Sequence, residues 1–284
     1  MTLTQLIPVL LQVSLALIVF GLGLRTLPSD LTYLLRQPAL LVRSVLSMNV
    51  VMPLVAAGIA AGFKLEPQVE LALVLLAVSP VPPVLPSKQM KAGGSASYAI
   101  GLLALSAVLA IAAVPLSVAA IGRWFGLTLT VPASLIARVV GGSVFAPLLA
   151  GVLVRQFGAG FAERASQALS TVGSAVLGVT AIVVLAGSWP ALTWSVGHFT
   201  VVAVMVFVLV SLGVGHLLGG PDEDDRTVLA LSTASRHPGV AMAIAGALAP
   251  DNKAIPAAVM LAFLVGLVLT GPYTKWRTGR SAKH

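Results

Sequence analysis

The chain has 284 residues, of which 58% are hydrophobic and only 9% are charged, and its formal net charge is +8. A soluble domain carries about 25% charged residues, so this chain has too few charges to cover a surface that faces water, and lipid is the expected surrounding. The absence of cysteine excludes disulfides, thiolate metal sites and cysteine nucleophiles. The excess of Lys and Arg lies mostly in loops and at the C-terminus, which predicts topogenic charge and no nucleic-acid partner.

Long apolar stretches follow one another along the whole chain. A membrane-spanning helix needs about 20 apolar residues, and we expect about nine spans, at residues 5–27, 38–63, 70–91, 95–124, 132–157, 165–189, 195–218, 226–249 and 255–273. The first stretch lacks the basic start and the cleavage site of a signal peptide, so we interpret it as a retained span. Short connections predict a single all-α polytopic membrane domain over residues 1–284.

The distribution of Lys and Arg predicts the orientation of the chain. With the N-terminus outside, only four basic residues fall outside, namely Lys64, Arg123, Arg138 and Lys253. The cytoplasmic side then receives Arg25, Arg36, Arg43, Lys88, Lys91, Arg155, Arg164, Arg226, Lys275, Arg277, Arg280 and Lys283. We therefore expect a multi-pass protein of the cell (inner) membrane with a cytoplasmic C-terminus.

The third span is interrupted by prolines. Pro80, Pro82, Pro83 and Pro86 lie within seven residues, and a proline inside a helix costs about 3 kcal/mol because it removes a hydrogen bond and clashes with the preceding turn. A continuous helix is therefore excluded. In lipid, the freed carbonyls must be satisfied by protein or by water in a cavity, so we expect this break to lie inside the bundle.

The eighth span is interrupted by a polar segment that contains Ser232, Ser235, Arg236, His237 and Pro238. An arginine near the membrane midplane costs about 3 kcal/mol on insertion scales, so it usually faces a cavity or a partner. The two breaks hold corresponding positions, with spans one to four matching spans six to nine in inverted topology. Paired interrupted spans of this kind are typical of the binding site of a secondary transporter.

Three stretches carry a resemblance to a known family. They are IVFGLGLRTLPSDLTYLLRQPALLVRSVLSMNVVMPLVA at residues 18–56, LALVLLAVSP at residues 71–80, and RTVLALSTASRHPGVAMAIA at residues 226–245. Together they resemble the bile acid:sodium symporter family. The resemblance implies ten helices in two inverted repeats, divided into a panel and a core. We expect this first helix to be absent here, which leaves about 1–124 as the first repeat and about 132–276 as the second.

The resemblance also implies where a sodium ion would bind, and this chain departs from the pattern there. The family's Ser-Asn pair falls on Leu85 and Pro86, its Glu on Ser232 and its Gln on Arg236. A further Gln falls on Met48, with Asn49 beside it. The usual sodium ligands are missing, so we expect no cofactor and favour proton coupling or uncoupled transport over sodium coupling.

Several roles remain open for the charged residues near the breaks. Arg236 could bind an anionic substrate or replace sodium as a fixed cation, or it could simply pair with carbonyls or with the acidic run Asp222–Asp225. His237 could carry a proton or fill a hydrogen-bond gap as a neutral side chain. Lys88 and Lys91 could line a vestibule for organic anions or could serve only as positive-inside anchors.

The function that fits these patterns is transport of a small organic anion by alternating access. The candidate substrate- or ion-binding residues are Asn49, Pro80, Pro82, Pro86, Ser232, Ser235, Arg236 and His237, with Lys88 and Lys91 as vestibule candidates. The alternative is a non-transporting membrane receptor or scaffold with the same fold. We find no catalytic motif, such as HExxH or a G-x-S-x-G elbow, so we expect no enzyme, no catalytic residue and no metal site. The oligomeric state is left open.

Overall fold

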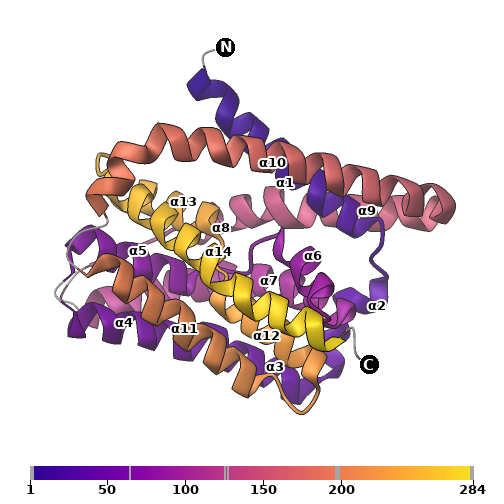
Figure 1. The fold of residues 1–284 in the computed structure, drawn as a ribbon, viewed down its shortest axis with the longest axis horizontal. Helices are drawn as coiled ribbons and strands as arrows, with labels where there is room; N and C mark the ends of the chain where they lie inside the picture. The colour runs from indigo at the N-terminus through magenta and orange to yellow at the C-terminus, as the bar shows by residue number, and fades with distance from the viewer. Residues whose placement is uncertain (1–2, 64, 125, 127, 196–198, 282–284) are drawn as a thin grey trace.

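A computed structural model describes residues 3–63, 65–124, 126, 128–195 and 199–281, and these residues contain helices and no strand (Figure 1). Lys64 and Lys283, which entered the predicted orientation, lie outside the described residues. The elements are α1 (Leu3–Gly23), α2 (Pro28–Leu31), η1 (Tyr33–Arg36), α3 (Pro38–Val45), η2 (Leu46–Val51), α4 (Met52–Gly62), α5 (Pro67–Val78), α6 (Leu85–Lys91), α7 (Ala96–Trp124), α8 (Ala133–Val140), η3 (Gly141–Phe145), α9 (Ala146–Phe157), α10 (Ala159–Ser195), α11 (Thr200–Leu218), α12 (Glu223–Ala234), α13 (Pro238–Leu248) and α14 (Ala254–Ser281).

Six helices within the described residues are long and apolar enough to cross a membrane. They are Pro38–Gly62, Ala96–Trp124, Ala133–Phe157, Ala159–Val183, Thr200–Leu218 and Ala254–Arg280. Shorter apolar helices cover Val9–Gly23 and Pro67–Val78. The predicted all-α polytopic membrane bundle is confirmed, while the number of nine spans stays a prediction. The sixth expected span, residues 165–189, is part of a longer helix, Ala159–Ser195.

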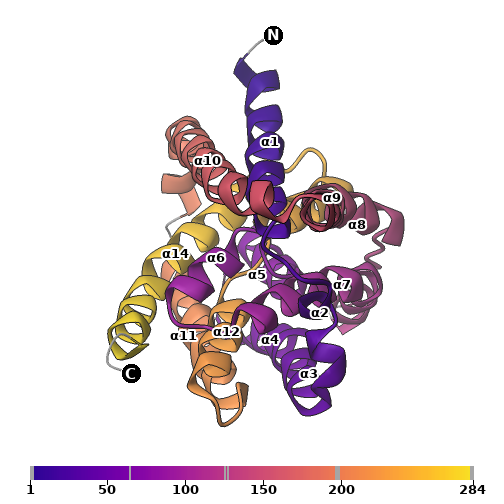
Figure 2. The ribbon, with the colours of Figure 1, turned by 90° about the vertical axis from the view of Figure 1, so that its right-hand side faces the viewer.

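The helices form two groups, which both ribbon views separate (Figures 1 and 2). The first group consists of α1, α8, η3, α9 and α10, and α1 packs along both α9 and α10. Gly23 and Gly151 allow this close packing, because a Cβ atom at Gly151 would stand 2.5 Å from the carbonyl oxygen of Phe20. Small residues bring membrane helices close together in this way.

The second group holds the buried core and consists of α3 to α7 and α11 to α14. From Leu71 to Val78, helix α5 carries only apolar side chains, and the residues from Ala72 to Val78 are buried, as expected for a helix with neighbours on every side. Helix α11 packs along α12 and α14. The groups meet where α8 contacts α7 and α13, and where α10 contacts α14.

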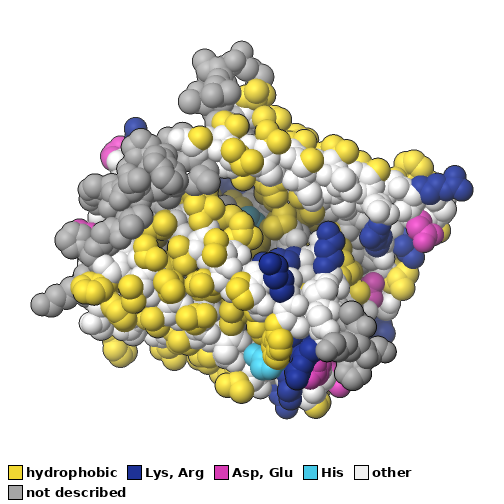
Figure 3. Space-filling model, viewed as in Figure 1, with side chains coloured by type: hydrophobic (Ala, Val, Ile, Leu, Met, Phe, Trp, Pro, Cys, Tyr) yellow, Lys and Arg dark blue, Asp and Glu magenta, His cyan; other side chains and the backbone are white. Residues whose placement is uncertain are grey.

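Charged side chains gather at one end of the bundle, which we call the basic end. It comprises α2, α6, the first turn of α12 and the C-terminal part of α14, and it carries Lys88, Lys91, Arg226, Arg277 and Arg280. In the space-filling view most Lys and Arg side chains lie toward this end, and the rest of the visible face is largely hydrophobic (Figure 3). Charged side chains are therefore concentrated at one end of the bundle.

Candidate functional site

The first break separates α5 from α6. Helix α5 ends at Val78, and the chain has no helical structure again until Leu85. Pro80, Pro82 and Pro83 lie within this gap and lack the N–H groups that would continue the helix. Pro86, which we predicted as part of the break, instead lies in the first turn of α6, where the missing N–H would have no helical partner.

The second break separates α12 from α13 and spans Ser235 to His237. His237 is the N-cap of α13, and its Nδ1 accepts a hydrogen bond from the backbone N–H of Val240 at 3.4 Å. The backbone N–H of His237 donates to the carbonyl oxygen of Pro80 at 2.9 Å. This bond joins the two breaks directly, so the two interrupted helices cross where both lose helical structure.

The Arg236 guanidinium fills the crossing point. Its Nη1 donates to the carbonyl oxygen of Ser79 at 3.1 Å, and its Nη2 donates to that of Met48 at 2.7 Å. The residue is only 4% exposed, and its Nε has no hydrogen-bond partner among the described residues. One side chain of the second break therefore ties together the first break and the helix Pro38–Gly62.

Prolines leave both of these carbonyls available. The Ser79 carbonyl would bond to the N–H of Pro83 in a continuing helix, and proline has none. Met48 lies in η2, a π-helical segment in which a carbonyl pairs with the N–H five residues ahead. That residue is Pro53, which again has no N–H. The sequence thus frees two carbonyls in the core, and Arg236 binds both.

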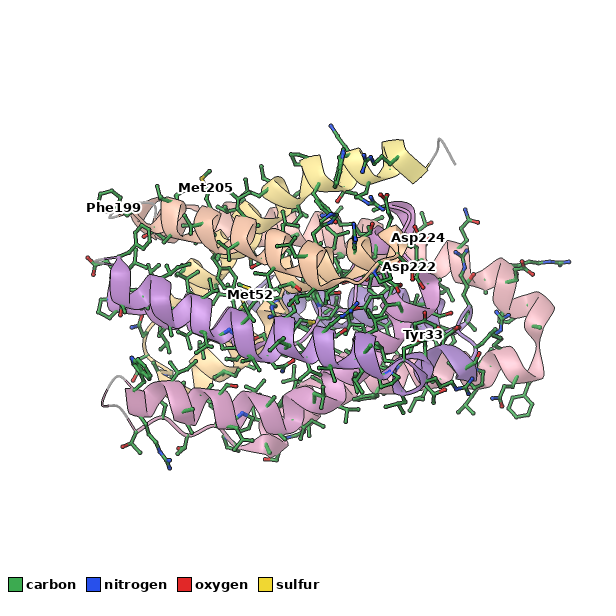
Figure 4. The ribbon with its side chains drawn as sticks, turned by 90° about the horizontal axis from the view of Figure 1, so that it is seen from below. Tyr33, Met52, Phe199, Met205, Asp222 and Asp224 are labelled. Atoms are coloured by element: carbon green, nitrogen blue, oxygen red, sulfur yellow. The ribbon has the colours of Figure 1, made fainter. Side chains whose placement is uncertain are left out.

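The acidic run Asp222–Asp225 is not the partner of Arg236. Asp222 and Asp224 lie at the same end of the molecule as Tyr33, whereas Met52, one turn from Met48, lies near the middle (Figure 4). In the structure, Arg236 pairs with backbone carbonyls, which is one of the roles that the sequence left open. Within the described residues no three His, Asp or Glu side chains cluster as they would around a metal ion.

A cavity of about 100 Å³ opens beside the breaks. Its polar lining comes from Lys88, Ser235, Arg236 and Thr270. The apolar lining comes from α5, the first break, α6, α11, the end of α12 and α14, and consists of Leu76, Pro82, Val84, Leu85, Val204, Phe207, Val208, Ala234, Ala262, Phe263, Gly266 and Leu267. Lys88 Nζ donates to Thr270 Oγ1 at 2.7 Å. The cavity is therefore an apolar chamber with cations in its wall.

Six of the ten predicted residues do not line this cavity, namely Asn49, Pro80, Pro86, Ser232, His237 and Lys91. Lys91 is exposed at the end of α6 and does not line the chamber, unlike Lys88 one turn earlier. Asn49 is half-buried and lines a different pocket of about 10 Å³, together with Ser106. Of the predicted residues, the cavity brings together Pro82, Ser235, Arg236 and Lys88.

Gln89 is a buried polar residue of the site that sequence reasoning missed. Its Nε2 donates to the carbonyl oxygen of Val228 at 2.8 Å and to Ser232 Oγ at 2.6 Å. This contact ties α6 to α12, and a second contact of 2.8 Å between Ser47 and Thr233 ties η2 to α12. The signal was available, since an uncharged polar residue within an interrupted span must find a partner inside the bundle.

Comparison with known proteins identifies the scaffold. A model of the sodium bile acid symporter family matches residues 12–193 of the chain. The chain belongs to the sodium bile acid symporter family. A relative in Bacillus subtilis (strain 168), described as the uncharacterized sodium-dependent transporter YocS, is 26% identical over 261 residues, which cover 88% of this chain and 77% of that protein.

Membership of the sodium bile acid symporter family makes this chain a membrane transporter. A small-molecule substrate and a lipid environment follow from the family and from the apolar helices. At the positions to which the resemblance assigns sodium ligands, this member carries the side chains of Met48, Leu85, Pro86, Ser232 and Arg236. Only the hydroxyl of Ser232 could donate a side-chain oxygen to an ion, and it already accepts a hydrogen bond from Gln89.

Proposed function

We propose that the protein carries a small organic anion across the membrane by alternating access, and that transport needs no sodium ion. Transport is instead coupled to protons or uncoupled. The observation that carries this proposal is the pair of hydrogen bonds from Arg236 to the carbonyls of Ser79 and Met48.

Sodium is held by oxygen atoms, and in broken-helix transporters these include backbone carbonyls of unwound segments. Here a guanidinium occupies two such carbonyls at the crossing. A second unit charge 4 Å away would be repelled by about 4 kcal/mol at an effective dielectric constant of 20. Arg236 thus supplies permanently the positive charge that a bound ion would supply reversibly.

The charge of the cavity favours an anion. Lys88 and Arg236 both line it, and no Asp or Glu does so among the described residues. A charge in an apolar site is costly unless it is paired. A bound anion would relieve that cost, whereas a cationic substrate would add to it.

Alternating access fits the two groups of helices. The group that contains α1, α9 and α10 would rock against the group that holds both breaks, and would expose the cavity to each side in turn. The Lys and Arg distribution supports an outside N-terminus and a cytoplasmic basic end in the inner membrane. The inverted repeats, at about 1–124 and 132–276, would give the two open states their similar geometry.

His237 takes a structural role in this scheme. Its Nδ1 accepts the bond from Val240 that caps α13, and a protonated ring could not accept there. The neutral side chain therefore fits the fold better than a cation does. This favours the hydrogen-bonding role over the proton carrier.

Uptake into liposomes tests the proposal. Purified protein is reconstituted, and accumulation of radiolabelled pyruvate, succinate and benzoate is followed under an imposed sodium gradient, a proton gradient or neither. We expect saturable uptake of an anion that an inward sodium gradient does not increase. Accumulation driven by sodium would overturn the sodium-independent mechanism and would align this chain with the name of the Bacillus relative. The absence of any anion flux would overturn the assigned substrate class.

A further inference from the structure

The wall of the cavity contains two cationic side chains from different elements. Lys88 comes from α6 and Arg236 from the second break. The partner of Lys88 Nζ is the uncharged hydroxyl of Thr270, and the partners of Arg236 are two backbone carbonyls. In the part of the chain that the structure describes, neither cation forms a salt bridge with a carboxylate.

Both cations keep unused hydrogen-bond donors. The ammonium group of a lysine has three donors, and Thr270 accepts one of those of Lys88. The Arg236 guanidinium donates through both Nη atoms, whereas its buried Nε has no hydrogen-bond partner among the residues that the structure describes. A buried donor without a partner is energetically unfavourable. The wall therefore holds two cations whose hydrogen-bond partners are uncharged oxygens, and an anionic oxygen would balance either charge better.

The rest of the lining suits a hydrocarbon spacer. Phe207, Phe263, Leu76 and Leu267 are among the apolar residues that line the same cavity as the two cations. The volume of about 100 Å³ is well below the roughly 300–1,000 Å³ typical of pockets for drug-sized ligands. The occupant should therefore be short, apolar in its middle and acidic at both ends.

We propose that the substrate is a short dianion of the dicarboxylate class, with one carboxylate on Lys88 and the other on Arg236. The inference rests on the proposed transport of organic anions and narrows its substrate class. A monoanion would leave one of the two wall charges without a counter-charge. Affinity should therefore depend on the second carboxylate and on Lys88 together.

A matched pair of probes tests the proposal on the purified full-length protein. Succinate has two carboxylates, and monomethyl succinate has the same carbon chain with one of them masked. Apparent affinities are measured at neutral pH from ligand-dependent thermal stabilisation in detergent. We expect wild type to bind succinate at least about tenfold more tightly than the ester, which corresponds to about 1.4 kcal/mol.

Two lysine variants on the same helix separate the site from general charge effects. Lys88→Gln should remove the preference for succinate over the ester. The affinity for succinate should fall at least about tenfold, while the affinity for the monomethyl ester changes little. Lys91→Gln is the control, because Lys91 is exposed one turn away and outside the cavity, and it should keep the preference. Lys88→Arg retains the charge and should keep it too.

The possible outcomes distinguish failure of the dianion proposal from failure of the proposed transport function. Equal binding of the ester and succinate by wild type, or a preference that survives in Lys88→Gln, would overturn the dianion proposal and leave a monocarboxylate carrier. If pyruvate, benzoate and succinate all fail to bind and to enter liposomes, the proposed function fails, and this inference fails with it. The wild-type comparison decides even if Lys88→Gln does not fold.

Discussion

Nη2 of Arg236 lies 2.7 Å from the carbonyl oxygen of Met48, a residue 188 positions earlier in the chain. The bond connects the second broken helix to a π-helical segment of a continuous span. The Met48 carbonyl is available because Pro53 has no N–H to donate to it. Arg236 supplies the donor that the proline lacks.

Replacing Arg236 should destabilise the protein and create a response to sodium. Arg236→Ala leaves the carbonyls of Met48 and Ser79 buried without donors, and hydrogen bonds from charged groups contribute about 1.5–3 kcal/mol each. We expect the free energy of unfolding to fall by about 3 kcal/mol, and sodium then to stabilise the variant more than choline does. The control is Arg138→Ala, because Arg138 is an exposed arginine. Sodium should stabilise neither this variant nor wild type more than choline does. Stabilisation of wild type by sodium would contradict the prediction.

Removing the Gln89 amide should loosen the contact between α6 and α12. Gln89→Met keeps similar bulk and removes the donor to Val228 and Ser232, so we expect a loss of about 1–3 kcal/mol in unfolding free energy. A double-mutant cycle with Ser232→Ala should give a coupling above about 0.5 kcal/mol. Strict additivity of the two changes would show that the Gln89–Ser232 bond does not stabilise the fold.

The close approach of α1 and α9 should not tolerate a side chain. A Cβ at Gly23 would clash with the carbonyl oxygen of Leu148 and stand 3.0 Å from the Cα of Gly151, and backbone atoms cannot rotate away. We expect Gly23→Ala to cost about 1–3 kcal/mol, measured by thermal unfolding in detergent. The control is Gly58→Ala, which has no atom within 4 Å of the new Cβ and should be neutral or slightly stabilising. Equal effects at the two sites would refute this packing argument.

Acidification should weaken the contact between α12 and α14 through Glu223. Its carboxylate lies 2.6 Å from Nη1 of Arg277, and the hydrogen bond and charge of Arg277 lower the pKa of Glu223 below its ordinary value of 4.5. Because the folded-state pKa is the lower one, the stabilisation is complete above about pH 4.5 and is lost as the pH falls through the folded-state pKa.

Thermal unfolding of wild type and Glu223→Gln between pH 7 and pH 3 provides the measurement. Wild type should be the more stable protein at neutral pH, and the difference in Tm should shrink toward the acid end. The effect should be modest, since half of the Glu223 side chain is exposed and solvent screens such pairs. A difference that stays constant with pH would mean that the Glu223 charge does not stabilise the fold.

Local chemistry made much of this fold predictable. Apolar runs of about 20 residues located the long helices, because an unpaired peptide group in lipid is too costly. Four prolines between Pro80 and Pro86 predicted the first break, although Pro86 belongs to the next helix. The position of Arg236 in a polar gap of the eighth span indicated a buried cation with partners inside the bundle.

The sequence by itself determined the helical membrane class and the two breaks, because each depends on residue type within one or two turns. Only the tertiary structure decided that Arg236 binds the carbonyls of Ser79 and Met48, that Gln89 supports α12, and that Lys88 lines the cavity while Lys91 does not. These contacts join residues 139 to 188 positions apart or depend on which face of α6 a lysine occupies. The packing of helices against one another determines both the long-range contacts and the face of α6 that each lysine occupies. A local sequence pattern does not contain this information.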